Sequence, residues 1–273
     1  MMTKVVQITD LHLVPSGRIL RGVDPEQRLR SCLRDIERFH QDATALVITG
    51  DLVDEAEPDV YDLLHGILAD YRLPPVHLTV GNHDDRRAFA RVFPGDVVSD
   101  TGFANKAVAL GNYLGILIDT WEFGTHAGAL CADRLSWLTA TLAADDRPVV
   151  LFMHHVPFNV GLKWLDRLPM KNDVDLARAL EPFRSRIRHL FFGHLHRNVS
   201  GTWMGYPFTV SASAAVHHGT LDFQSEISRP MIVDPFYTVI LLGDDQVVVH
   251  ANQVIANPVL VDYGPSPPPR HTA

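Results

Sequence analysis

The chain of 273 residues has little cysteine: only Cys32 and Cys131 occur, and they lie far apart in the sequence. Cysteine-rich metal sites and disulfide-stapled secreted folds need more thiols than this. We therefore interpret both as reduced packing residues and expect a cytoplasmic protein. The chain also lacks any run of about 18 apolar residues, the length that a membrane-spanning helix needs. Since residues 1–4 lead directly into a strand-like run, we expect no signal peptide.

Positive charge is scarce as well: the chain has 24 Lys and Arg residues but 32 Asp and Glu residues, and its net charge is −8. Nucleic-acid polymers and anionic membranes are usually bound by basic surfaces, so we expect neither partner. The hydrophobic fraction of 46% and the charged fraction of 21% are those of an ordinary globular protein. The length is sufficient for one large domain with a buried core.

What the chain does contain is an alternation of strand-like and helical patterns. Apolar runs rich in Val, Ile, Leu and Phe predict strands at residues 4–9, 45–49, 76–80, 149–153 and 187–192. Helical spacing predicts helices at 24–39, 58–71, 133–142 and 174–183, the first with Asp24 as its N-cap and Pro25 behind it. Shorter strands are expected at 98–118 and from 206 onwards, with a hairpin at 237–250. This alternation predicts an α/β layered fold.

Five short polar motifs stand where strand-like runs end. They are Asp10-Leu11-His12, Gly50-Asp51-Leu52-Val53-Asp54, Gly81-Asn82-His83-Asp84, His154-His155 and Gly193-His194-Leu195-His196. Because ligands of open α/β sheets bind beyond the carboxyl ends of the strands, we expect all five motifs to converge on one edge. Carboxylates, an amide and imidazoles, without thiolates, suit hard or borderline divalent ions. The pattern predicts a hydrolase with two metal ions that share a bridging carboxylate.

The spacing within the motifs supports this reading. In an extended segment, residues two apart point the same way, so Asp10 and His12 are expected to reach one ion. Asp51 follows Gly50, which permits a tight turn, and its two carboxylate oxygens can bridge two ions. His194 and His196 repeat the first spacing, although they need not bind the same ion. Each motif alone could be an ordinary turn or a packed pair of histidines. The prediction of a two-metal site therefore depends on the five motifs together.

The order of these motifs resembles that of the calcineurin-like metallophosphoesterases, over roughly residues 3–220. The resemblance implies a four-layer α/β/β/α sandwich with a small cap. It also implies two divalent ions, with Mn, Fe, Zn and Co as candidates. One ion would be held by Asp10, His12, Asp51 and His196, and the other by Asp51, Asn82, His154 and His194. His83 would stand beside these ligands and face the substrate.

Residues around the motifs indicate a branch of that family. Phosphoprotein phosphatases carry Arg and Glu where this chain has Glu55 and Asp84. The short chain, the Phe-Met-His-His-x-Pro segment and the Ala-Val-His segment ending at His217 resemble class III cyclic nucleotide phosphodiesterases and bacterial glycerophosphodiesterases. In that group a cap, often completed by a partner subunit, shapes substrate choice. The resemblance therefore implies a homo-oligomer, a dimer or larger.

We accordingly expect a metal-dependent phosphodiesterase for small phosphodiesters, either glycerophosphodiesters or 3′,5′-cyclic nucleotides, acting by in-line attack of a metal-bound hydroxide. Asp51 and Asn82 are expected to take part in catalysis, with Asn82 orienting the phosphoryl group. His83 is expected to protonate or hydrogen-bond the leaving oxygen, or alternatively to orient Asp10 or Asp51. His217 is expected to line the substrate pocket, and His155 to point away from His154 without binding metal.

Two other functions stay open at this point. A broad-specificity phosphomonoesterase or nuclease would use the same metals, but a nuclease favours a basic groove that the composition does not indicate. An inactive protein-binding scaffold would typically have lost ligands, whereas every ligand position is filled here. We predict a single domain at 1–262, with cap elements at about 156–176 and 217–236. A Pro-rich disordered tail is expected at 263–273.

Overall fold

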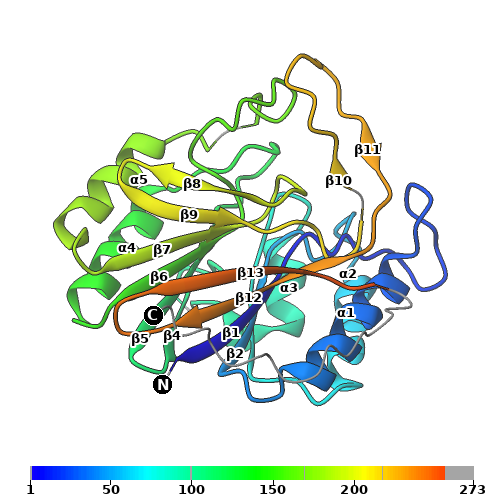
Figure 1. The fold of residues 1–273 in the computed structure, drawn as a ribbon, viewed down its shortest axis with the longest axis horizontal. Helices are drawn as coiled ribbons and strands as arrows, with labels where there is room; N and C mark the ends of the chain where they lie inside the picture. Colours follow the sequence, from blue (N-terminus) through cyan, green and yellow to red (C-terminus); the bar gives the residue numbers. More distant parts are fainter. Residues whose placement is uncertain (1, 99, 169, 217, 256–273) are drawn as a thin grey trace, which may run out of the picture.

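The computed structural model describes residues 2–98, 100–168, 170–216 and 218–255 (Figure 1). His217 and the expected tail at 263–273 lie outside the described residues. No helix within the described ranges has both the length and the apolar character needed to cross a membrane.

Two mixed sheets form the centre of the molecule. The first has the strand order β13-β12-β1-β2-β3 and the second the order β4-β5-β6-β7-β9-β8. The first sheet consists of β1 (Thr3–Ile8), β2 (Ala45–Thr49), β3 (Val76–Thr79), β12 (Phe236–Leu242) and β13 (Val247–Gln253). The second consists of β4 (Lys106–Leu110), β5 (Tyr113–Ile118), β6 (Val149–Met153), β7 (Ile187–Phe192), β8 (Val199–Trp203) and β9 (Tyr206–Val210). A separate pair, β10 (His218–Gly219) and β11 (Pro230–Met231), extends from one end of the sandwich (Figure 1).

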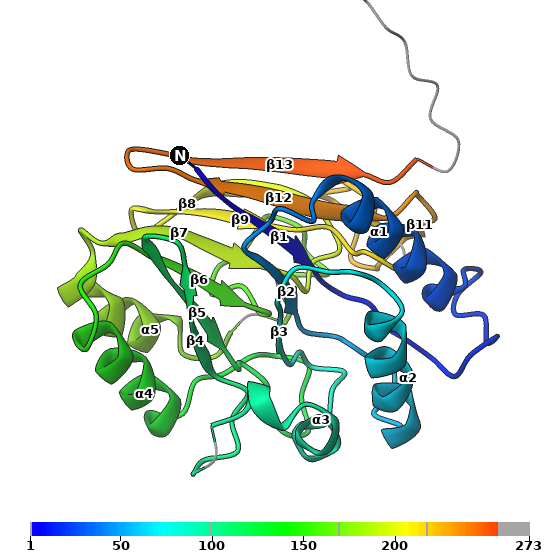
Figure 2. The ribbon, with the colours of Figure 1, turned by 90° about the horizontal axis from the view of Figure 1, so that it is seen from below.

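Helices cover the outer face of each sheet (Figure 2). The helices α1 (Pro25–Phe39), α2 (Pro58–Ala69) and α3 (Arg86–Val92) lie on the side of the first sheet. On the side of the second sheet lie α4 (Ala132–Ala143) and α5 (Asp173–Leu180). Short 3₁₀ turns at Pro94–Asp96 and Glu181–Phe183 complete the described helical segments. The order of layers is α/β/β/α, which confirms the predicted fold class.

The inner strands β1 and β2 of the first sheet carry apolar residues on both faces, and the structure explains why. Val6 and Ile8 of β1 pack against the helices, while Val5 belongs to a core between the two sheets. In that inter-sheet core Val5 joins Val47 of β2 and Phe152 of β6. A strand whose alternate residues meet two different apolar layers has no polar face, so its sequence reads as a continuous apolar run.

Most predicted elements are confirmed, and two differences are informative. The predicted Asp24 cap accepts a hydrogen bond from the backbone N–H of Gln27 at 3.0 Å and starts α1. The short helix α3 was not predicted, because its seven residues make only about two turns, too short a window for a helical period to show. The five motif-bearing strands were expected at one sheet edge, but β1, β2 and β3 belong to the first sheet and β6 and β7 to the second. The sandwich, rather than one sheet, brings their carboxyl ends together.

Candidate metal centre

The motifs begin where their strands end, and the backbone there changes conformation. Five of the predicted ligands have a positive φ: Asp10 (54°), His12 (43°), Asp51 (47°), His194 (70°) and His196 (49°). A non-glycine residue in this region costs about 1–3 kcal/mol, and such residues cluster at functional sites. The expectation that Asp10 and His12 lie in an extended segment is therefore wrong, since β1 has ended at Ile8. The side chains of Asp10 and His12 nevertheless lie in the same group of ligand atoms.

Two motif glycines make this backbone possible. Gly50 has a φ of 85°, a conformation that lets the chain turn sharply into Asp51. A Cβ atom on Gly81 would lie 2.4 Å from Oδ1 of Asp51 and 2.8 Å from Nε2 of His154. Any side chain at Gly81 would consequently push apart the carboxylate and the imidazole.

A first cluster joins Asp10, His12, Asp51 and His196, whose ligand atoms all lie within 4.8 Å of one another. Nε2 of His196 is 3.1 Å from Nε2 of His12 and 3.2 Å from Oδ1 of Asp10. Nε2 of His12 is 3.5 Å from Oδ2 of Asp51. Ligand atoms around one tetrahedral ion at about 2.1 Å lie roughly 3.4 Å apart. The spacing of these four groups fits one divalent ion.

A second cluster shares Asp51 with the first. Nε2 of His154 lies 3.3 Å from Oδ2 of Asp51 and 3.2 Å from Oδ1 of Asn82. The ring centroid of His194 is 5.2 Å from that of His154. Among the described residues, the buried Nε2 of His194 has no hydrogen-bond partner. Since a buried polar atom without a partner is costly, this nitrogen fits a ligand of a second ion.

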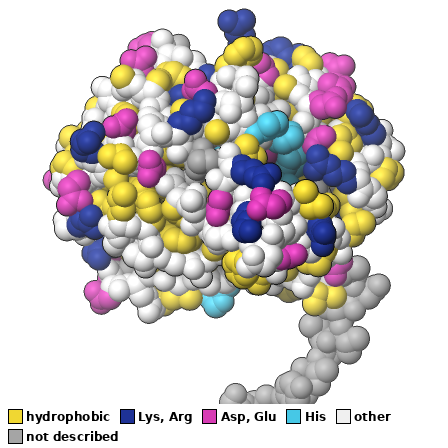
Figure 3. Space-filling view, turned by 90° about the horizontal axis from the view of Figure 1, so that it is seen from above, with side chains coloured by type: hydrophobic (Ala, Val, Ile, Leu, Met, Phe, Trp, Pro, Cys, Tyr) yellow, Lys and Arg dark blue, Asp and Glu magenta, His cyan; other side chains and the backbone are white. Residues whose placement is uncertain are grey.

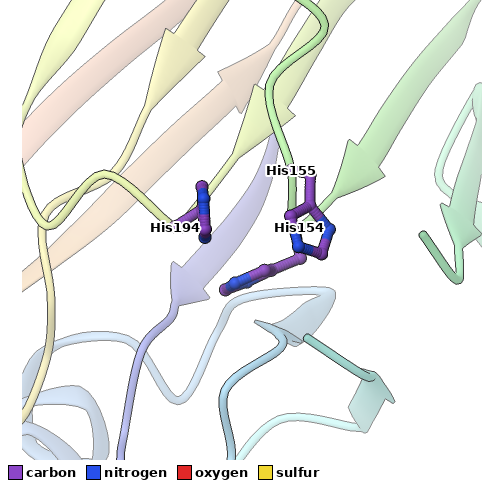
Figure 4. Close-up of side chains that lie close together, drawn as sticks. All are labelled: His154, His155 and His194. Atoms are coloured by element: carbon purple, nitrogen blue, oxygen red, sulfur yellow. The ribbon is translucent and has the colours of Figure 1, made fainter. Parts of the chain in front are cut away.

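His155 lies closer to this cluster than expected. Its ring centroid is 4.8 Å from that of His154 and 4.7 Å from that of His194 (Figure 4). The expectation that it points away from His154 is wrong, because β6 ends at Met153 and strand alternation no longer applies. Nδ1 of His155 lies 2.7 Å from the hydroxyl of Thr120. The hydrogen bond that holds this ring therefore comes from the loop after β5.

Two of the clustered imidazoles are held by hydrogen bonds on their outer nitrogen. Nδ1 of His12 is 3.0 Å from Oδ1 of Asp54, and Nδ1 of His154 donates to the backbone carbonyl of Thr49 at 2.8 Å. In both rings Nε2 is left to face the cluster. Such outer partners set the orientation of metal-binding histidines and their basicity. Asp54, the last residue of the second motif, thus orients His12.

The electrostatics of the clusters favour the protonation states that bind metal. Burial would raise the pKa of Asp51, but the neighbouring His154 and His12 hold it well below its ordinary value. Burial lowers the pKa of His12, while burial and His154 lower the pKa of His194 to about 3. For His154 burial also opposes the charge, yet Asp51 raises its pKa to about 9. Ionised carboxylates and neutral imidazoles are the metal-binding forms, so His154 must release a proton to bind metal.

His83 lies beside the clusters, as predicted. Its backbone N–H donates to Oδ1 of Asp51 at 2.9 Å, and its ring Nδ1 donates to the backbone carbonyl of Asp54 at 2.8 Å. Within the described ranges its ring makes no hydrogen bond to Asp10 or Asp51. The backbone N–H of His83 does bond to Asp51, so both predicted roles of His83, at the leaving oxygen and in orienting a carboxylate, stay predictions. The ring keeps Nε2 for another partner.

Two residues near the centre were given no role at the site from the sequence, although Asp84 belongs to the third motif. His126, in the loop after β5, accepts at Nδ1 a hydrogen bond of 2.9 Å from Nδ2 of Asn82. This bond leaves Oδ1 of Asn82 facing His154, and no motif around His126 indicated it. Asp84 is buried and accepts from the backbone N–H groups of Leu52 and Gly81. Burial and the nearby Asp51 raise the pKa of Asp84 to about 7.

One cavity of about 300 Å³ opens onto both clusters. Its floor contains five of the predicted ligands together with His83 and His126, and they are His12, Asp51, Asn82, His194 and His196. Trp164, Leu165 and Leu168 form an apolar part of the lining, which also includes Arg21, Leu195, Gly219 and Ser228. Figure 3 shows histidine side chains in the hollowed part of this face, with acidic and basic side chains around them. The volume lies at the lower end of the range for small-molecule sites.

Comparison with known proteins shows that the chain is similar to phosphoesterases. Residues 3–198 match the sequence model of the calcineurin-like phosphoesterases. A probable cyclic nucleotide phosphodiesterase of Rhodopseudomonas palustris is 37% identical over 256 residues, covering 90% of this chain and 91% of that protein. The 3′,5′-cyclic adenosine monophosphate phosphodiesterase CpdA of Escherichia coli is 30% identical over 217 residues, covering 78% and 76%. A dimetal phosphatase from Danio rerio shares the fold, with a TM-score of 0.67, 16% identity and coverage of 93% and 96%.

Proposed function

Because this chain belongs to the calcineurin-like phosphoesterases, and is therefore a metal-dependent phosphodiester hydrolase, we propose that its substrates are 3′,5′-cyclic nucleotides. The names of the similar bacterial proteins support this choice over glycerophosphodiesters. In the proposed reaction, water opens the cyclic phosphodiester and yields a nucleoside monophosphate.

One observation carries the proposal that hydrolysis takes place at the paired clusters. The carboxylate of Asp51 lies between them, 3.5 Å from Nε2 of His12 and 3.3 Å from Nε2 of His154. A single carboxylate shared in this way is what two adjacent ions require. A structural ion pair would need only one of these imidazoles.

We propose that Asp10, His12, Asp51 and His196 hold one divalent ion, and that Asp51, Asn82, His154 and His194 hold the other. When bound, two such ions lower the pKa of a coordinated water and offset the charge of the phosphoryl oxygens. The donor set contains oxygen and imidazole nitrogen without thiolate, which suits Mn, Fe, Zn or Co.

The other residues of the floor position the substrate. Asn82 uses one amide hydrogen for His126, so its second hydrogen is free to contact a phosphoryl oxygen. His83 donates its Nδ1–H to the carbonyl of Asp54, so Nε2 is the atom left for the leaving oxygen, to which it donates when the ring carries its second proton. Both residues line the cavity, and each has one polar group committed to the protein and one left for substrate.

Three further expectations accompany this proposal. Residues 156–176 and 217–236 are proposed as the cap that limits substrate size, with His217 outside the described residues. A homo-oligomer stays a prediction, and so does the single domain at 1–262. Cys32 and Cys131 are free thiols, which supports a reducing compartment such as the cytoplasm.

A substrate panel after metal removal tests the function. The protein is stripped with a chelator and reloaded with Mn²⁺, Co²⁺, Zn²⁺ or Fe²⁺ in separate samples. Each sample is then assayed with cyclic AMP, glycerophosphocholine, glycerophosphoethanolamine, bis(p-nitrophenyl) phosphate and p-nitrophenyl phosphate. We expect hydrolysis only after reloading, and the highest kcat/KM for cyclic AMP. Unchanged hydrolysis without metal contradicts the mechanism, and a preference for a glycerophosphodiester or the monoester contradicts the substrate.

A further inference from the structure

The lining of the cavity has two unlike parts. One is the floor formed by Asp51, Asn82 and the imidazoles. The other is an apolar part formed by Trp164, Leu165 and Leu168, which we call the cap wall; Arg21 and Ser228 also line the cavity. The cap wall contributes no predicted metal ligand and no group to the proposed chemistry, so its apolar surface needs another explanation.

The cap wall is a defined structure rather than a loose loop. The backbone N–H of Leu165 donates to the carbonyl of Leu162 at 2.9 Å, and the N–H of Leu168 donates to the carbonyl of Leu165 at 3.0 Å. The carboxylate of Asp166 accepts from the N–H groups of Val160 and Gly161 at 2.7 and 2.9 Å. These bonds close successive turns, so Trp164 is carried on a fixed backbone.

A second segment of the chain fixes the indole ring from behind. A Cβ atom on Gly219 of β10 would lie 2.7 Å from Cζ2 of Trp164, so the ring packs directly on the glycine backbone. The carbonyl of Gly219 accepts a hydrogen bond from the guanidinium of Arg197. Glu226, in the loop between β10 and β11, pairs with Lys163 at 3.4 Å and also with Arg167. The ring is consequently held with part of its surface towards the cavity.

The chemistry of the cap wall selects among phosphodiesters. With the phosphate on the floor, the part of the substrate that reaches the cap wall contacts an indole flanked by two leucines. Glycerol and ethanolamine groups are hydrogen-bonding and would lose water against this surface without compensation. A nucleobase presents a flat π-face, and stacking on an aromatic side chain contributes about 1–3 kcal/mol.

We propose that the cap wall is the subsite for the base of the nucleotide and that Trp164 is a specificity-determining residue. This proposal rests on the proposed function, because it assigns the part of the substrate remote from the phosphate. Trp164 stacks on the base, and Leu165 and Leu168 exclude water from the edges of the stack.

The test compares Trp164→Ala and Trp164→Phe with a matched control, Trp137→Ala. Trp137 is also a half-buried tryptophan, but it lies on α4 and does not line the cavity. We expect Trp164→Ala to lower kcat/KM for cyclic AMP about tenfold or more, mainly through KM, and to leave glycerophosphoethanolamine within about twofold. Trp164→Phe should recover most of the loss. An equal loss for both substrates, or a selective loss for glycerophosphocholine, would overturn the assignment.

A binding measurement separates this assignment from the proposed function. Calorimetry on the metal-loaded protein compares adenosine 5′-monophosphate with ribose 5-phosphate, which differ only by the base. We expect the wild type to favour adenosine 5′-monophosphate about tenfold or more, and Trp164→Ala to lose that ratio while retaining its metal content. One outcome is that the wild type fails to hydrolyse cyclic AMP and yet prefers adenosine 5′-monophosphate, with the preference lost in Trp164→Ala. In that case the proposed function is wrong and the base subsite is supported. If cyclic AMP is hydrolysed and the ratio is unchanged in Trp164→Ala, the subsite is wrong.

Discussion

The floor and the cap wall line one cavity, yet they are built differently. The cluster residues Asp10, Asp51 and His154, of which Asp51 reaches the floor, are at most 2% exposed and follow strands of the two central sheets. The cap wall comes from the segment between β6 and α5 and is backed by the β10–β11 pair. Around that pair large apolar side chains are exposed, Leu221 to 60% and Phe223 to 51%. The proposed metal ligands thus belong to the core, whereas the proposed base subsite is formed by loops, which can change without unfolding the core.

We expect the largest effect from a substitution of Asp51, the residue that both clusters share. Asp51→Asn removes the charge that both clusters use, so we expect metal content to fall to one ion or fewer per chain. Hydrolysis of bis(p-nitrophenyl) phosphate should fall at least about a thousandfold, because the ions provide several kcal/mol of stabilisation. Elemental analysis and steady-state kinetics measure the two effects. Asp59→Asn, an exposed acid on α2, is the control, and two retained ions with normal rate would contradict the shared role.

A second change separates catalysis from metal binding within the floor. His83→Ala should keep both ions and lower kcat by about a hundredfold or more, since it removes a proton donor to the leaving oxygen. His65→Ala, an exposed histidine on α2, serves as the matched control. Loss of metal in His83→Ala would show instead that this residue supports the cluster.

Substitution of His126 should have a smaller effect, limited to metal binding at the floor. His126→Ala removes the acceptor that orients Asn82, so we expect metal affinity to fall about tenfold. His126→Asn, which offers an amide oxygen as acceptor, should recover part of that loss. Isothermal titration with Mn²⁺ measures the affinity. The ratio between adenosine 5′-monophosphate and ribose 5-phosphate should not change, and a change would mean that floor and cap wall are coupled.

We expect the smallest effect from pH, which should change the stability of the β10–β11 pair but not that of the core strands. Burial, with Arg197 and His196, lowers the pKa of His218 from 6.5 to about 4. Above pH 6.5 the ring is neutral whether β10 is closed or open, so pH has no effect there. Between about pH 6.5 and 4 only the open form binds the proton, so stability of the closed pair falls as pH falls.

Hydrogen exchange of the β10–β11 amides, corrected for intrinsic rates, measures this opening. We expect a few-fold loss of protection from about pH 7 to about pH 6, with the amides of β2 unaffected. His218→Phe can still stack on Phe236 and should abolish the pH dependence. An unchanged dependence in this variant would show that another group titrates.

Several features were determined by the sequence alone. Strands β2, β6 and β7 lie where apolar runs predicted them, and Asp24 starts α1 as expected. The residue types of the five motifs also indicated the metal chemistry and the family. These features could be predicted because they depend on neighbours within a few positions, where periodicity, capping and motif spacing act.

Other features were decided only by the tertiary structure. The packing of two sheets brings β1 and β7 together, so the backbone N–H of His194 donates to the carboxylate of Asp10 at 3.1 Å. The left-handed backbone at the ligands, the bond from Asn82 to His126 and the contact of Trp164 with Gly219 join segments far apart in the chain. No local pattern encodes such contacts, because their stability comes from burying surfaces that meet only after the chain has folded.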